Sequence, residues 1–116
     1  MKYTVMHSLA AISLLIAGRA LSTEMPPSAK KGNCILCHAI DKKTIGPAWL
    51  DVSKKYKGLA KYTYKGVEYN LEEGLALKIR KGGHGAWGNT TMPSTPPAIK
   101  DEEIKELVQF ILGLDK

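Results

Sequence analysis

The stretch that decides the fold is Cys34-Ile35-Leu36-Cys37-His38, which holds both cysteines of the 116-residue chain. Two cysteines three positions apart fit a redox dithiol, part of a zinc site or an attachment point for haem. A disulfide between them would close too small a loop to stabilise the fold. Since a domain of this size has a marginal core, a cofactor bound at this stretch is favoured.

The spacing C-x-x-C-H is the attachment signal of c-type haem. On a helix, Cys34, Cys37 and His38 stand at positions i, i+3 and i+4 and share one face. Both thiols can then add to the vinyl groups along one porphyrin edge. The neutral imidazole of His38 can bind the iron below the same ring.

Two other chemistries compete for these cysteines. A zinc site wants four ligands, and only the remote His84 could join Cys34, Cys37 and His38. A thioredoxin-like site expects a βαβ context, which the pattern of the chain lacks. Covalent attachment of one haem c is therefore the favoured interpretation.

The first residues are typical of a secretory signal peptide. Lys2 and His7 precede the apolar run 9–17, and small residues follow it. The run is shorter than the roughly 20 apolar residues that cross a bilayer; a core helix or an uncleaved anchor is the alternative. We expect residues 1–22 to be a signal peptide cleaved within about 20–22, and 23–116 to be one domain with no integral membrane segment, located in the periplasm.

The chain is basic, with 17 Lys and Arg against 11 Asp and Glu. Removing residues 1–20 takes away two basic residues and no acidic ones, which changes the formal charge from +6 to +4. Export and the lack of a basic patch interleaved with aromatics argue against nucleic acid. Lysines bracket the motif at positions 30, 31, 42 and 43, so we expect an acidic protein partner. Solvated helix faces are the alternative explanation.

Four helices are expected, from N-cap, proline, glycine and periodicity signals. They run from Pro27 into the cysteine motif, from Pro47 to Lys57, from Leu71 to Lys81, and over 101–114. Asn70 and Glu73 predict a capping box for the third helix, in which Gly74 is a local weakness. The fourth carries a stripe at Ile104, Leu107, Val108, Ile111 and Leu112. Segment 59–70 is predicted as loop, with a short hairpin as the alternative, and 82–97 as irregular.

Met92 is the expected second axial ligand, because a loop within 82–97 could bring its thioether to the far face of the ring. Met1 and Met6 leave with the signal peptide, and Met25 lies too close to the helix of the motif. Ordinary apolar packing of Met92 is one alternative. Ligation by His84 is the other.

These residues together resemble the small bacterial class I cytochromes c, of the cytochrome c-551/c-552 type. The likeness rests on CILCHAIDKKTIGPAW (34–49), KIRKGGHGAWG (78–88), Met92-Pro93 and the acidic start of the last helix. It implies an all-α fold of about four helices around one covalently bound haem, with His38 and Met92 as axial ligands.

The resemblance also assigns neighbours of the haem. It places Pro47 beside His38, and Lys78 and Trp87 at the haem propionates, although Lys78 could simply be exposed and Trp87 a core residue. Phe110 resembles the aromatic that packs the last helix on the first, near Gly32.

Two departures from the family pattern stand out. Asn89-Thr90-Thr91 replaces a proline-rich segment before Met92, and Thr95 follows where relatives often place an asparagine that bonds the sulfur. Thr95 or Asn89 are the candidates to replace it. The tyrosine-bearing stretch 61–70 resembles an insertion.

The functional expectation is a soluble, monomeric one-electron carrier and not an enzyme. Electrons would pass through the haem edge near Cys34 and Cys37. The alternative is a haem protein with an open or labile sixth site, either a gas-binding sensor or an electron-donating subunit of an oxidoreductase.

Overall fold

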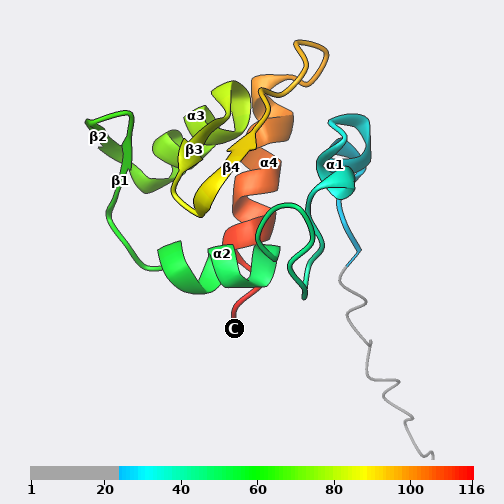
Figure 1. The fold of residues 1–116 in the computed structure, drawn as a ribbon, viewed down its shortest axis with the longest axis horizontal. Coiled ribbons are helices and arrows are strands. Elements are labelled where there is room, and N and C mark those ends of the chain that lie inside the picture. The colour runs from blue at the N-terminus through cyan, green and yellow to red at the C-terminus, as the bar shows by residue number, and fades with distance from the viewer. Residues whose placement is uncertain (1–23) are drawn as a thin grey trace, which may run out of the picture.

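A computed structural model describes residues 24–116 (Figure 1); the expected signal peptide lies outside them. This part of the chain has four α-helices, one 3₁₀ turn and two two-stranded antiparallel sheets. The helical elements are α1 (Pro27–Lys31), η1 (Cys34–Leu36), α2 (Trp49–Tyr56), α3 (Leu71–Lys81) and α4 (Asp101–Leu112). The strands are β1 (Lys61–Tyr64), β2 (Val67–Asn70), β3 (Gly83–Gly85) and β4 (Gly88–Met92).

Helix α4 is the centre of the fold, since it contacts α1, α2 and α3 (Figure 1). The predicted apolar stripe is confirmed: Ile104, Leu107, Val108 and Ile111 are buried, and Leu112 is half-buried. At the N-terminus of α4, the Glu103 carboxylate accepts the backbone N–H of Lys100 at 2.8 Å. Together, stripe and cap explain why this segment is helical between Asp101 and Leu112.

The predicted continuous helix from Pro27 through the cysteine motif is wrong. Helix α1 ends at Lys31, and Asn33 has a left-handed backbone with φ 59°. Asparagine tolerates that conformation, which interrupts a helix. The chain then re-enters a 3₁₀ turn, and the N–H of His38 donates to the Cys34 carbonyl at 2.9 Å. The motif is thus one turn on its own, in which Cys34 and His38 are still linked as i and i+4.

The loop predicted for 59–70 is a β-hairpin. Tyr62 and Tyr64 are buried while Lys61 and Thr63 are exposed, which is the period of two that a half-buried strand requires. The turn at Lys65-Gly66 has positive φ at both residues, 48° and 78°. Such turns match the twist of paired strands, so this dipeptide closes the hairpin.

The segment predicted as irregular, 82–97, contains a second hairpin. Strands β3 and β4 pair Gly83 with Met92 and Gly85 with Gly88, with an irregularity between them. The glycines allow the bends that this short ribbon needs.

Helix α3 spans the predicted residues, but its predicted capping box is absent. The Asn70 side chain makes no cap bond; its side-chain amide oxygen, Oδ1, instead accepts from the Lys61 ammonium at 3.2 Å.

Helix α2 begins at Trp49, two residues later than predicted, and Ala48 has an extended backbone. The Pro47 carbonyl accepts a bond from a side chain outside the helix, described below.

The core consists of two apolar clusters that share α4. One gathers Tyr56, Tyr62, Tyr64, Leu75 and Val108. The other gathers Ala29, Trp49, Leu107 and Ile111, with Phe110 packed against it. Over residues 24–116, no helix has the length and apolar character needed to cross a membrane.

Candidate haem site

A cavity of about 240 Å³ collects most of the predicted site residues. Its walls include Cys37, His38, Pro47, Lys78, Trp87 and Met92. Cys34 lines a smaller void, about 20 Å³, that His38 and Met92 also border. Residues far apart in the sequence are therefore brought to one place, as the expected haem site requires.

The imidazole of His38 is fixed by a loop that follows the motif. Its Nδ1 lies 2.8 Å from the Pro47 carbonyl oxygen, which can only accept, so Nδ1 carries the proton and donates. Nε2 is then the nitrogen with a free lone pair. The loop closes on Cys37, whose carbonyl accepts from the Gly46 N–H at 2.7 Å and the Thr44 hydroxyl at 2.5 Å.

The backbone of Gly46 packs closely against the His38 ring. A Cβ at Gly46 would stand 2.6 Å from Cε1 of the imidazole. Trp49 approaches the same imidazole with 5.8 Å between ring centroids. The histidine ring is therefore confined by a glycine, a carbonyl and an indole, all of which come from the eleven residues that follow it.

The two cysteines are unpaired and partly exposed. Burial is the main reason why the pKa of the Cys34 thiol is raised, and the neighbouring Cys37 adds to it. A raised pKa disfavours the reactive thiolate. A backbone hydrogen bond acts in the opposite direction, but the net effect raises the pKa of Cys34 and does not favour a redox role for this thiol.

Met92 ends strand β4, half-buried beside the cavity. The hydroxyl of Thr95 donates to the Ile79 carbonyl at 2.6 Å, so its only proton is already engaged. Thr95 is thus unsuited to the expected role of hydrogen-bond donor to the sulfur. Asn89, the other candidate, is exposed on β4.

Lys78 and Trp87 both face the cavity. Burial, and secondarily Lys65, lowers the pKa of the Lys78 ammonium. Trp87 is 39% exposed and packs edge-on against Tyr56, with 6.3 Å between centroids. Lys55 lies over the Trp87 ring, 4.5 Å from its centre. Lys78 is more than an exposed helix lysine, and Trp87 is not a core tryptophan.

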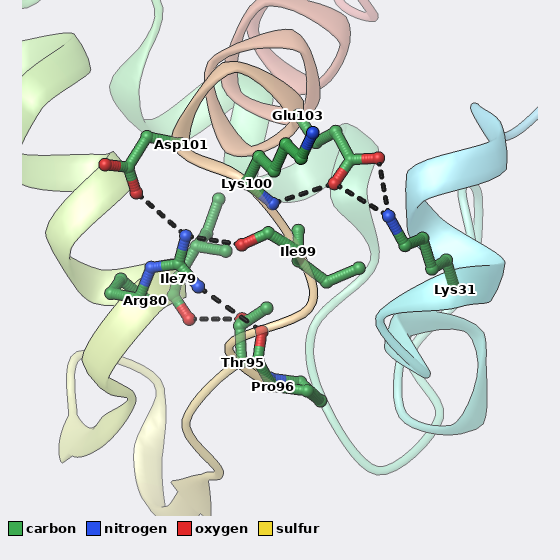
Figure 2. A network of polar contacts seen from close by, with 9 residues as sticks. All are labelled: Lys31, Ile79, Arg80, Thr95, Pro96, Ile99, Lys100, Asp101 and Glu103. Carbon is green, nitrogen blue, oxygen red and sulfur yellow. Dashed lines mark hydrogen bonds and ion pairs between the residues drawn. The ribbon is translucent and has the colours of Figure 1, made fainter.

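Sequence reasoning missed Arg80, which organises the segment after Met92 (Figure 2). Its guanidinium donates to the Ile99 carbonyl at 2.6 Å and pairs with Asp101 at 2.8 Å. Its own carbonyl accepts the Thr95 N–H at 3.1 Å. These partners are 15 to 21 residues away, so no local pattern could have indicated them. A basic residue in the last turn of α3 was the only signal.

The residues around the cavity fit a c-type haem. The two thiols are unbridged; that of Cys34 borders the smaller void, while that of Cys37, the His38 imidazole with its free Nε2 and the Met92 thioether border the cavity. Trp49, Ile79 and Val108 give that space apolar walls. This donor set is the one that holds a porphyrin covalently and leaves two axial ligands for iron.

Comparison with known proteins agrees with this fit. A family model described as Cytochrome c matches residues 17–115. The chain is 43% identical to cytochrome c-552 of Hydrogenobacter thermophilus over 86 residues, 74% of this chain and 76% of the relative. It is 36% identical to cytochrome c-551 of Pseudomonas aeruginosa over 113 residues, 97% of this chain and 98% of the relative.

Solved structures show the same fold. The crystal structure of wild-type Nitrosomonas europaea cytochrome c552 is similar, with a TM-score of 0.61 and 36% identity, covering 76% of this chain and 96% of that one. The expected all-α fold is confirmed, with two small hairpins added to it. Such homologues imply an electron carrier with a c-type haem. The chain therefore belongs to the cytochrome c family, as a small class I c-type cytochrome with one covalently attached haem.

Proposed function

We propose that this chain is a monomeric periplasmic one-electron carrier whose iron has His38 and Met92 as axial ligands. Thioether bonds from Cys34 and Cys37 hold the porphyrin. The observation that carries the proposal is the His38–Pro47 hydrogen bond, which leaves Nε2 free in a cavity that Met92 also lines. The periplasmic location is supported by the signal-peptide pattern of residues 1–22.

The bound haem supplies exchange of one electron between ferrous and ferric iron. The chain tunes that exchange through its ligands. The Pro47 carbonyl fixes the tautomer of His38 and increases the basicity of the ring. A thioether from Met92 raises the potential compared with a second histidine.

Lys78 and Trp87 are the proposed partners of the haem propionates. A cation and an indole N–H suit a carboxylate, and both residues line the cavity. Lys55 supports Trp87 from α2, since its ammonium also donates to the neighbouring Ala86 carbonyl at 3.1 Å. The side of the cavity proposed for the propionates thus has two ammonium groups near it, that of Lys55 from α2 and that of Lys78 from α3.

An acidic redox protein is the proposed partner. Apolar side chains stand exposed on the motif and the following loop, with exposed fractions of 43% at Ile35, 68% at Leu36 and 61% at Ile45. The lysines at 30, 42 and 43 are exposed near them. Lys31 is engaged with Glu103 at 3.0 Å and is not counted among them. Exposed apolar side chains with lysines close by in the sequence favour an anionic partner, whose association would depend on salt.

The test compares Met92→Ala with Met25→Ala, a methionine packed on the second core cluster. We expect the ferric protein to show the weak methionine–iron charge-transfer band, and only Met92→Ala to lose it. Ferrous Met92→Ala should bind carbon monoxide rapidly, and the unmodified protein should not. Survival of the band in Met92→Ala would disprove the ligation. Rapid binding by the unmodified protein would indicate an open sixth site instead.

A further inference from the structure

The β1–β2 hairpin is the part of the chain that the electron-carrier function does not yet explain. It lies at one edge of the molecule, against α3 (Figure 1). Of its residues only Tyr62 lines the cavity, and Lys65 at its turn acts on the site by lowering the pKa of Lys78. Its two buried tyrosines, Tyr62 and Tyr64, contact α3 and the glycine that follows it.

Tyr62 meets α3 at Gly74. A Cβ at Gly74 would stand 2.8 Å from both Cβ and Cδ1 of Tyr62, so only glycine lets the strand come this close. Glycine inside a helix is otherwise unfavourable. The weak point of α3 is thus the place where the hairpin is seated on the helix.

Tyr64 meets α3 at its end. The phenol of Tyr64 donates to the Gly82 carbonyl at 2.8 Å, and this bond is buried. Gly82 follows the last residue of α3, and its side-chain-free Cα faces the strand that ends in Met92. A buried hydrogen bond at this point fixes where the chain leaves the helix.

Gly82 in turn packs against the backbone of Met92. It has φ 71° and ψ −156°, a region that is essentially reserved for glycine. A Cβ there would lie 2.2 Å from the Met92 carbonyl oxygen and 2.8 Å from the Pro93 carbonyl carbon. The next residue, Gly83, pairs with Met92 in the sheet. The backbone of Met92 therefore rests directly on the residue that Tyr64 holds.

We infer that the β1–β2 hairpin is a clamp on the Met92 strand, in which Tyr64 is the positioning residue. Tyr62 seats the hairpin on α3, Tyr64 fixes Gly82, and Gly82 fixes the backbone of Met92. The consequence for the iron rests on the proposed ligation by Met92: a clamped strand keeps the thioether bound, and a released one lets it leave. The clamp itself consists of contacts to the backbone of Gly82 and Met92, so amide hydrogen exchange can test it whether or not Met92 binds the iron.

The experiment compares Tyr64→Phe with Tyr69→Phe, which removes the same atom from a half-buried tyrosine of the same hairpin. Amide hydrogen exchange is measured in the haem-loaded protein. Loss of one buried hydrogen bond should speed exchange at Gly83 and Met92 by roughly 2- to 12-fold in Tyr64→Phe. Tyr69→Phe should leave these two amides unchanged. Equal acceleration in both variants, or none in Tyr64→Phe, would overturn the clamp.

A second readout separates positioning from general stability. On heating, Tyr64→Phe should lose the methionine–iron charge-transfer band at a lower temperature than the unmodified protein does. The midpoint of the far-UV transition of the helices should fall by less than the midpoint of the band. A role in stability alone would move the two transitions together and would contradict the inference. If Met92 is not the ligand, the band persists in Met92→Ala while the exchange result still stands, so the two failures are distinguishable.

Discussion

A methyl group at Gly46 would collide with the imidazole of His38. In Gly46→Ala the new Cβ would lie 2.6 Å from Cε1, 2.9 Å from Nδ1 and 3.1 Å from Nε2 of the ring. Carbon atoms in ordinary contact stand roughly 3.5–4.0 Å apart. Gly46 has no positive φ, so its backbone suits alanine and the effect is steric alone.

The size of the effect follows from what has to move. The ring or the loop must retreat by about 1 Å to reach ordinary contact. The loop is tied to Cys37 by two hydrogen bonds, of 2.7 and 2.5 Å, and the ring to Pro47 by one of 2.8 Å. Overpacking costs about 1–3 kcal/mol, and loss of the partly buried His38–Pro47 hydrogen bond costs about 0.5–1.5 kcal/mol. The expected loss of unfolding free energy is therefore about 1.5–4.5 kcal/mol.

The assay is thermal unfolding followed by far-UV circular dichroism. For a domain of this size, 1 kcal/mol shifts Tm by roughly 4–8 °C, so the smallest expected loss lowers Tm by roughly 6–12 °C. Gly113→Ala is the control, because it adds the same methyl at φ −82° with its nearest neighbour 3.2 Å away. A Tm within about 2 °C of the unmodified protein, with unchanged His38 ring resonances, would refute the reasoning.

Two further predictions concern Arg80 and Tyr62. Arg80→Gln removes a charged donor from the buried Ile99 carbonyl, so it should lower the unfolding free energy by about 1.5–3 kcal/mol in denaturant titrations; an effect no larger than that of the exposed Lys105→Gln would contradict this. Burial raises the pKa of Tyr62 to about 12, whereas an unfolded tyrosine ionises near about 10. Stability should therefore be lost as the pH rises from about 10 to 12, and Tyr62→Phe should lose less of it in melts over this range; an identical loss would count against the burial of the phenol.

The helices that sequence reasoning placed correctly are those whose signals are local. Helix α4 has an acidic start and a periodic stripe, and α3 ends at a pair of glycines. For segment 59–70 a loop was preferred to the alternative of a short hairpin, because the β1 and β2 strands have four residues each, too few for alternation to outweigh a loop. The prediction of one helix running into the motif was wrong at Asn33. Its left-handed backbone interrupts a stretch whose sequence pattern is otherwise helical.

Local rules also failed at Gly74, where the reason is tertiary. Propensity alone marks this glycine as a defect of α3. The structure shows that the missing side chain makes room for Tyr62. A residue that violates the preference of its own helix is therefore best interpreted as the mark of a close contact from elsewhere in the chain.

The two halves of the proposed iron site differ in the same way. His38 is held by Pro47, nine residues away, within one short loop. The surroundings of Met92 depend on bonds that span 16 to 19 residues, from Thr95 to Ile79, from Tyr64 to Gly82 and from Arg80 to Ile99. A short loop closes at little entropic cost, so the sequence indicates the proximal half directly. The distal half exists only once α3, both hairpins and α4 have assembled, and partial unfolding should therefore release Met92 before His38.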